Sequence, residues 1–170
     1  MLTHVEFFPK DAIHGISHKT RMSAVMVSIL SSVDGEFPRP NLANFVSNLS
    51  LDFVDCYEDV LNIPIGGWGN QLENLPGRFK GSSAGFNEHG PTLTHARQIQ
   101  RFLATHQEHP EQLVVMAHCF GGISRSAAVA EYASSRYHIP VAGNYTDLSR
   151  ANPRLLYLLW QAEAESHSKK

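Results

Sequence analysis

The sequence predicts an α/β fold of one domain over residues 1–170, with a central, mostly parallel sheet flanked by helices. The length of 170 residues fits a single domain that buries a sizeable core. Short β-branched apolar runs alternate with segments of helical periodicity, which is typical of a parallel sheet. The run QLVVMA at 112–117 is apolar without alternation, as expected for a strand that is covered on both faces.

The first half of the chain contains the less regular elements. Residues 22–30 (MSAVMVSIL) predict a strand, and 42–49 have the apolar spacing of a helix. Residues 52–57 and 60–65 predict two short strands or one interrupted strand. The stretch 66–90 is dense in Gly, Ser, Asn and Pro, and it predicts a long loop. Such a loop is either a functional lid or binding loop, or a tolerated surface insertion.

The second half is more regular. Residues 91–106 predict a helix with one apolar face and Pro91 near its start. After the strand at 112–117, residues 124–138 predict an alanine-rich helix. Residues 152–166 predict a terminal amphipathic helix. In a parallel sheet built this way, a ligand site is expected beyond the carboxyl ends of the strands.

Composition argues against several classes of protein. The formal net charge of -2 provides no basic field for nucleic acid or an anionic membrane. Two cysteines, Cys56 and Cys119, are too few for a disulfide framework. The first residues lack a signal-peptide pattern, and no apolar run reaches the roughly 18–20 residues that span a bilayer. We therefore expect a cytoplasmic protein that binds neither nucleic acid nor a membrane, of unknown oligomeric state.

The segment AHCFGGISRS at 117–126 carries the strongest functional signal. Cys119 follows the predicted strand, and Arg125 stands after five intervening residues at the start of a predicted helix. Gly121 and Gly122 allow a tight bend in which backbone N–H groups form an anion-binding nest. These donors and Arg125 stabilise a thiolate, and the guanidinium matches two oxygens of a phosphoryl group. A nucleophile, a cradle for oxygens and a charge clamp are the parts of phosphoryl transfer through a cysteinyl-phosphate intermediate.

This phosphate-binding loop lies between a strand and a helix and needs no metal or organic cofactor. The predicted substrate-binding residues are Phe120, Gly121, Gly122, Ile123, Ser124 and Arg125.

The segment HCFGGISRS resembles the H-C-x-x-G-x-x-R-S/T signature of cysteine-dependent protein tyrosine phosphatases. The compact length resembles the dual-specificity-like branch, including its small bacterial members, over a core of about 22–162. The resemblance implies that Cys119 is the nucleophile and that Arg125 clamps the phosphate. It further implies that Ser126 stabilises the leaving thiolate, and that His118 supports the loop from behind without acting as the base.

The general acid of the family, usually Asp, is not evident from the sequence. In compact relatives it closely follows the strand equivalent to 60–65, where this chain has Gly66, Gly67 and Trp68. We expect Glu88 to be the acid, because it lies in the long loop 31 residues before Cys119, a typical separation in the family. Loop placement also suits a residue that closes over substrate.

Two other carboxylates are weaker candidates for the acid. They are Glu73, in the same loop, and Asp59, which flanks a predicted strand.

The resemblance implies a phosphatase acting on phosphotyrosine, and also on phosphoserine or phosphothreonine, whose partner is a phosphorylated protein or small phosphoester. A phosphatase for a nucleotide or phosphoinositide is an alternative, as is a catalytically weak phosphate-binding pseudophosphatase. Some relatives protect an oxidised nucleophile with a neighbouring cysteine. A Cys56–Cys119 disulfide is therefore a hypothesis, and an ordinary core thiol at Cys56 is its alternative.

Overall fold

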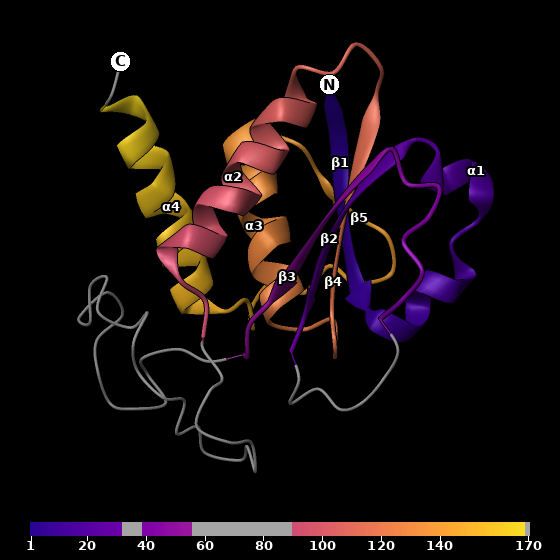
Figure 1. Ribbon diagram of the computed structural model, residues 1–170, viewed down its shortest axis with the longest axis horizontal. Coiled ribbons are helices and arrows are strands. Elements are labelled where there is room, and N and C mark those ends of the chain that lie inside the picture. The colour runs from indigo at the N-terminus through magenta and orange to yellow at the C-terminus, as the bar shows by residue number, and fades with distance from the viewer. Residues whose placement is uncertain (32–38, 56–89, 169–170) are drawn as a thin grey trace.

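The computed structural model describes residues 1–31, 39–55 and 90–168, which form a five-stranded, all-parallel sheet of order β3-β2-β4-β1-β5 (Figure 1). The strands are β1 (Leu2–Pro9), β2 (Ala24–Leu30), β3 (Ser47–Asp52), β4 (Leu113–Cys119) and β5 (Val141–Ala142). The helices are the 3-10 helix η1 (Lys10–Gly15), α1 (His18–Arg21), α2 (Leu93–Gln107), α3 (Arg125–Tyr137) and α4 (Pro153–His167). The α/β class and the parallel sheet are confirmed. The predicted strands at 22–30 and 112–117 become β2 and β4, and the three predicted helices become α2, α3 and α4.

The first strand, β1, is absent from the sequence-based prediction although it lies inside the sheet, between β4 and β5. Its alternation is hidden by a register shift between Leu2 and His4. As a result Leu2 and Val5, three residues apart, both enter the core beneath the helices. The expected core range of 22–162 therefore leaves out a strand that pairs on both of its edges.

The helix predicted at 42–49 is wrong. Leu42 and Phe45 pack on one side of the sheet, whereas Leu49 packs on the other, so their helical spacing does not mark one helix face. Residues from Ser47 onward form β3, which pairs only with β2 among the described strands. Of the described residues 52–55 in the strand predicted at 52–57, only Asp52 lies in a strand. Residues 56–57 and 60–65 lie outside the described part of the chain.

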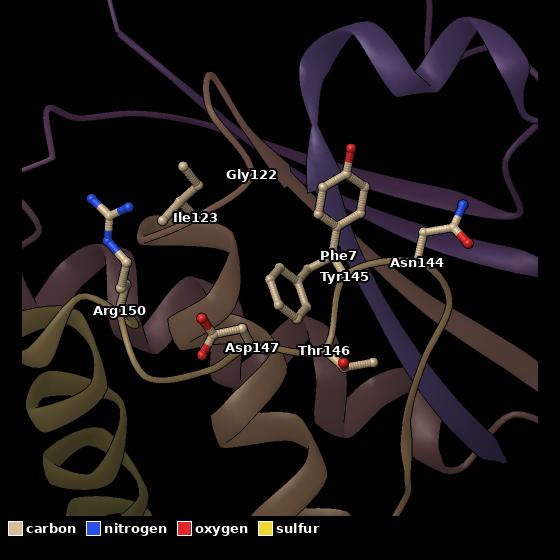
Figure 2. A pocket seen from close by; sticks show the side chains of 8 residues that line it. All are labelled: Phe7, Gly122, Ile123, Asn144, Tyr145, Thr146, Asp147 and Arg150. Atoms are coloured by element: carbon tan, nitrogen blue, oxygen red, sulfur yellow. The ribbon is translucent and has the colours of Figure 1, made fainter.

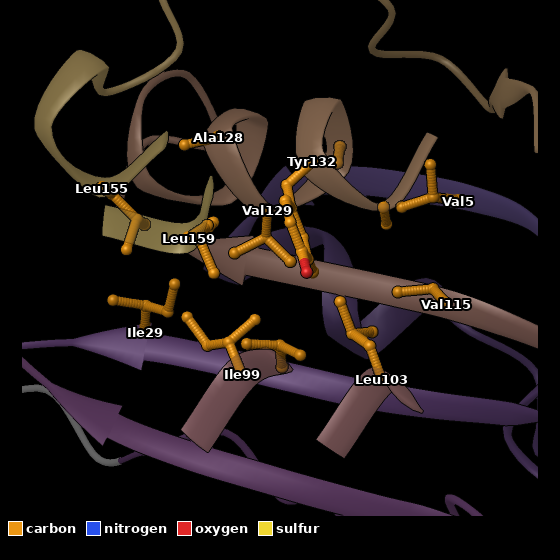
Figure 3. Packing of buried hydrophobic residues seen from close by; sticks show 14 of the residues in the cluster. Val5, Ile29, Ile99, Leu103, Val115, Ala128, Val129, Tyr132, Leu155 and Leu159 are labelled. Carbon is orange, nitrogen blue, oxygen red and sulfur yellow. The ribbon is translucent and has the colours of Figure 1, made fainter. Parts of the chain in front are cut away.

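The helices form two unequal layers on the sheet (Figure 1). The larger layer contains α2, α3 and α4, and the smaller one contains η1 and α1. Figure 3 shows the main core, in which Val5, Ile29 and Val115 of the sheet meet Ile99 and Leu103 of α2. None of the helices in the described residues is long and apolar enough to cross a membrane.

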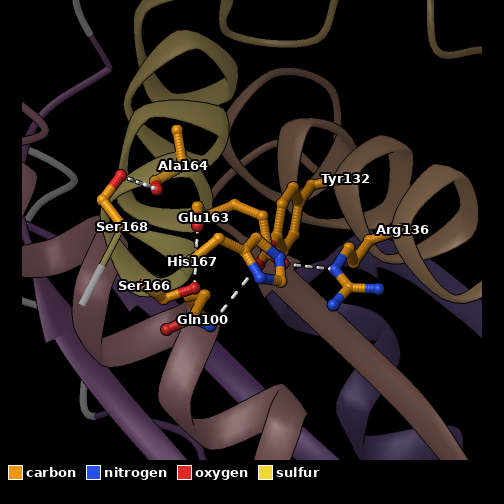
Figure 4. Close-up of polar contacts among 8 residues, drawn as sticks. All are labelled: Gln100, Tyr132, Arg136, Glu163, Ala164, Ser166, His167 and Ser168. Atoms are coloured by element: carbon orange, nitrogen blue, oxygen red, sulfur yellow. Dashed lines mark hydrogen bonds and ion pairs between the residues drawn. The ribbon is translucent and has the colours of Figure 1, made fainter. Parts of the chain in front are cut away.

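A buried carboxylate joins the three helices of the larger layer (Figure 4). Glu163 of α4 accepts hydrogen bonds from Tyr132 Oη at 2.7 Å and Arg136 Nε at 2.6 Å, both on α3. It also contacts His167 Nε2 at 2.8 Å and Gln100 Nε2 of α2 at 3.4 Å. Burial alone would raise the pKa of Glu163, but the hydrogen bonds with Tyr132, Arg136 and His167 outweigh it and hold the pKa below its usual 4.5.

We expect Glu163→Gln to lower the free energy of unfolding by about 1–3 kcal/mol, because a buried hydroxyl and a guanidinium lose their charged acceptor. Glu165→Gln is the matched control on the same helix, since Glu165 pairs with Arg97 at a partly exposed position. That change should cost less than about 1 kcal/mol. Urea unfolding at pH 7 measures both. Because the folded-state pKa of Glu163 is depressed, its contribution should disappear as pH falls below 4.5. Equal losses for the two variants would contradict the proposed joining role.

Candidate functional site

The loop from Cys119 to Arg125, called here the Cys119 loop, joins the end of β4 to the start of α3. Cys119 is only 2% exposed and is a free thiol. Its Sγ lies 3.2 Å from the Oγ of Ser126, in the first turn of α3. The predicted pairing of a nucleophile with a stabilising hydroxyl therefore has the geometry of a direct contact.

Gly122 sets the path of the Cys119 loop. Its φ of +63° is a conformation that side-chain-bearing residues rarely adopt. A Cβ at this position would lie 2.2 Å from the backbone N of Pro9 and 2.4 Å from the carbonyl carbon of Phe8. The loop thus rests on the end of β1. Gly121 differs, because a Cβ there would meet nothing closer than the Ile123 side chain at 3.8 Å.

Arg125 is buried, and its guanidinium is hydrogen-bonded to the segment that follows β3. Its Nη1 donates to the carbonyl oxygen of Phe53 at 2.9 Å, just beyond the end of β3. An arginine side chain has five N–H donors in a fixed fork, so one anchored donor orients the plane of the whole group. Burial and this anchor place a permanent positive charge beside the loop.

A triangle of hydrogen bonds braces the loop at Ser124. The Oγ of Ser124 donates to Asp55 Oδ1 at 2.7 Å, and Asn152 Nδ2 donates to the same oxygen at 2.8 Å. The backbone N–H of Asn152 closes the triangle by donating to the Ser124 carbonyl at 3.0 Å. Asn152 also caps α4 through Leu155 N at 2.8 Å. Because Ser124 makes no side-chain cap hydrogen bond on α3, its hydroxyl serves this triangle.

Asp55 is a site residue that the sequence analysis missed. The acids expected from the sequence, Glu88, Glu73 and Asp59, lie outside the described residues, whereas Asp55 lies shortly after the end of β3 at Asp52. The signal that points to it is topological. Since β3, β2 and β4 are parallel neighbours, their carboxyl ends meet at one edge, which brings Asp55 to the Cys119 loop.

His118 lies in β4, directly before Cys119. It is fully buried and stacks on Phe8, with ring centroids 6.4 Å apart and planes 8° from parallel. Burial lowers the pKa of His118 to about 4; the backbone of Cys119 opposes this, and the charge of Arg125 adds to it. Neither ring nitrogen makes a hydrogen bond of normal geometry to the described residues. The ring is therefore a neutral packing element near pH 7.

A pocket of about 300 Å³ adjoins the Cys119 loop on the side of β5 (Figure 2), and we call it the β5-side pocket. It is lined by Phe7, Gly122, Ile123, Asn144, Tyr145, Thr146, Asp147 and Arg150. Since β3 and β5 are at opposite ends of the strand order, Asp55 and this pocket flank the loop from opposite sides.

The structure brings together every predicted site residue from His118 to Ser126. Glu88, Glu73 and Asp59 lie outside the described residues, as does Cys56, the partner in the disulfide hypothesis. Within the part of the chain that the structure describes, no three or more His, Cys, Asp or Glu residues are grouped to hold a metal ion.

The parallel sheet, and the loop that joins β4 to α3, define a tyrosine phosphatase-like fold. The structure is similar to the crystal structure of the human tyrosine phosphatase-like serine/threonine/tyrosine-interacting protein. The match covers 95% of this chain and 93% of that one. The TM-score is 0.51 and the sequence identity is 17%, so the likeness concerns the fold alone. It supports the phosphatase-like fold and does not support the bacterial-type branch. No family model matches the chain, and no curated protein matches its sequence.

We expect Gly122→Ala to lower the free energy of unfolding by at least about 2 kcal/mol, because of the positive φ and the clash with Pro9. The fraction of the Gly122→Ala variant that still folds should also bind tungstate, a phosphate analogue, more weakly, since the loop can no longer rest on β1. Gly121→Ala is the matched control and should change stability by less than about 1 kcal/mol. Urea unfolding and tungstate titration measure the two effects. Equal behaviour of the two variants would show that the loop does not depend on this contact.

The pKa of His118 predicts a loss of stability in acid. The folded-state value of about 4 lies below the ordinary 6.5, so the unfolded chain binds the extra proton first. Above pH 6.5 the shift does not change the free energy of unfolding. As pH falls from 6.5 to 4, it lowers the free energy of unfolding progressively, by about 3 kcal/mol. His118→Phe should remove this part of the pH dependence in urea unfolding. Phe8→Leu weakens the same packing without removing the titrating ring, so it should keep the dependence. A wild-type profile in His118→Phe would disprove the assignment.

Proposed function

We propose that this protein is a cysteine-dependent phosphatase of the compact, dual-specificity-like type that hydrolyses phosphotyrosine. The observation that carries the proposal is the Cys119 loop itself. It places a buried thiol 3.2 Å from Ser126 Oγ and an anchored Arg125 on one bend at the carboxyl edge of a parallel sheet.

The proposed reaction has two steps. The Cys119 thiolate attacks phosphorus, the bond from phosphorus to the phenolic oxygen breaks, and the leaving oxygen takes a proton from a general acid. The amides of 120–125 and Arg125 hold the phosphoryl oxygens during the transfer. Water then attacks the cysteinyl phosphate, releasing inorganic phosphate, and the departing thiolate accepts a hydrogen bond from Ser126.

Two carboxylates are proposed for the general acid. Glu88 rests on the sequence analysis alone. Asp55 is favoured by its contact with the loop, where its Oδ1 lies 2.7 Å from Ser124 Oγ. The same contact also supports a second function. If Asp55 serves only to brace Ser124 and Asn152, and Glu88 does not supply the proton, the loop binds phosphate without efficient hydrolysis, as in a pseudophosphatase.

We expect wild-type protein to hydrolyse p-nitrophenyl phosphate and a phosphotyrosine peptide, and Cys119→Ser to abolish both activities, because no other nucleophile occupies its place. Release of inorganic phosphate measures turnover. A phosphoserine peptide, a nucleotide and a phosphoinositide in the same assay decide among the substrate classes. Turnover that survives Cys119→Ser would refute the mechanism. Absence of turnover by folded wild type that still binds tungstate would establish the phosphate-binding alternative.

The same assay identifies the acid through its dependence on the leaving group. Loss of a general acid should slow phenyl phosphate by about 10²–10⁴-fold but p-nitrophenyl phosphate much less, because its phenolate leaves without a proton. Asp55→Asn and Glu88→Gln are matched isosteric variants, and the acid is the one that shows this difference. A variant of Asp55 that slows both substrates equally would assign Asp55 to bracing the loop.

A further inference from the structure

We propose that the β5-side pocket is a specificity subsite that accepts one uncharged, apolar side chain next to the phosphorylated residue of a peptide substrate. This inference rests on the proposed function, since it concerns the surroundings of the same phosphate-binding loop.

The position of the pocket connects it to the Cys119 loop. Gly122 and Ile123 belong both to that loop and to the pocket wall. Ile123 is 42% exposed although it stands in the middle of the phosphate-binding segment. A peptide whose phosphate lies in the loop therefore passes beside the Ile123 side chain, and its next residue meets the pocket.

One part of the pocket wall is apolar, while Asn144, Thr146, Asp147 and Arg150 form its polar part. The rings of Phe7 and Tyr145 lie 6.5 Å apart with their planes tilted by 50°. Figure 2 shows Ile123 on the left of both rings, so two aromatic rings and one branched aliphatic side chain line the same pocket. A volume of about 300 Å³ is at the lower end of the range for ligand sites. It fits a single side chain better than a whole organic ligand.

The charges at the rim argue for an uncharged occupant. Asp147 and Arg150 both line the pocket and carry opposite charges. Hydrogen bonds from Ser149, including its backbone N–H at 2.9 Å, lower the pKa of Asp147 and keep it ionised. An acidic or phosphorylated neighbour would be attracted by Arg150 but repelled by Asp147, and the reverse holds for a basic one. Neither charge is favoured, which leaves burial of apolar surface as the main source of affinity.

The test measures binding of fluorescein-labelled phosphotyrosine peptides to Cys119→Ser protein by fluorescence anisotropy. The peptides carry Gly, Leu, Phe, Asp, Lys or phosphoserine on either side of the phosphotyrosine. We expect the Leu and Phe peptides to bind about tenfold more tightly than the Gly peptide at one flanking position. Adding Tyr145→Ala should remove that preference. Tyr157→Ala is the matched control on α4, because Tyr157 and Tyr145 are equally exposed at 40%.

Three results would overturn the subsite. They are equal affinity for the Gly and Leu peptides, no effect of Tyr145→Ala on the preference, and tightest binding of a charged neighbour. Turnover of p-nitrophenyl phosphate by wild type separates the two proposals, because this substrate has no flanking residue. Turnover without a peptide preference refutes the subsite alone. A peptide preference without turnover supports the subsite and refutes the enzymatic activity. Absence of both binding and turnover refutes both proposals.

Discussion

The close approach of Gly122 to the end of β1 is the constraint on which the site depends. The peptide unit between Phe8 and Pro9 occupies the space where any side chain at Gly122 would stand. The chain therefore leaves β4, crosses over the end of β1 and enters α3 in one tight bend. This path places the thiol of Cys119 beside Ser126, and it also brings Ile123 to the wall of the β5-side pocket.

Around this bend, parts of the chain that are distant in sequence are fastened to one another. Phe53 and Asp55, after β3, hold Arg125 and Ser124, and Asn152 links the same carboxylate to the start of α4. Farther along α3, Tyr132 and Arg136 are tied to α4 through Glu163. The helix that begins with Arg125 is thus fixed at both of its ends. Such double fixing is a way to keep charged donors preorganised before a substrate arrives.

Sequence reasoning identified the second half of the chain well, since its periodicity and its chemistry agree. The helices α2, α3 and α4 each bury one apolar face, and the Cys119 loop stands where a parallel strand ends. The first half was harder to interpret for physical reasons. A register shift disguises β1, and Leu42, Phe45 and Leu49 are spaced as on a helix while they contact opposite sides of the sheet. Asp55 was not predicted, because its position beside the Cys119 loop depends on which strands are neighbours in the sheet. No local sequence pattern indicates that strand order.

The place of β1 in the strand order has a consequence for how the chain reaches its folded state during synthesis. Among the five strands β1 is made before the others, yet its partners are β4 at 113–119 and β5 at 141–142. More than a hundred residues must therefore emerge from the ribosome before β1 can pair, and such long-range pairing is intrinsically slow. Until then, the surface on which Gly122 will rest does not exist. The Cys119 loop is therefore expected to be among the last parts of the molecule to acquire its shape, and a nascent chain that stalls before β4 would leave β1 without either partner.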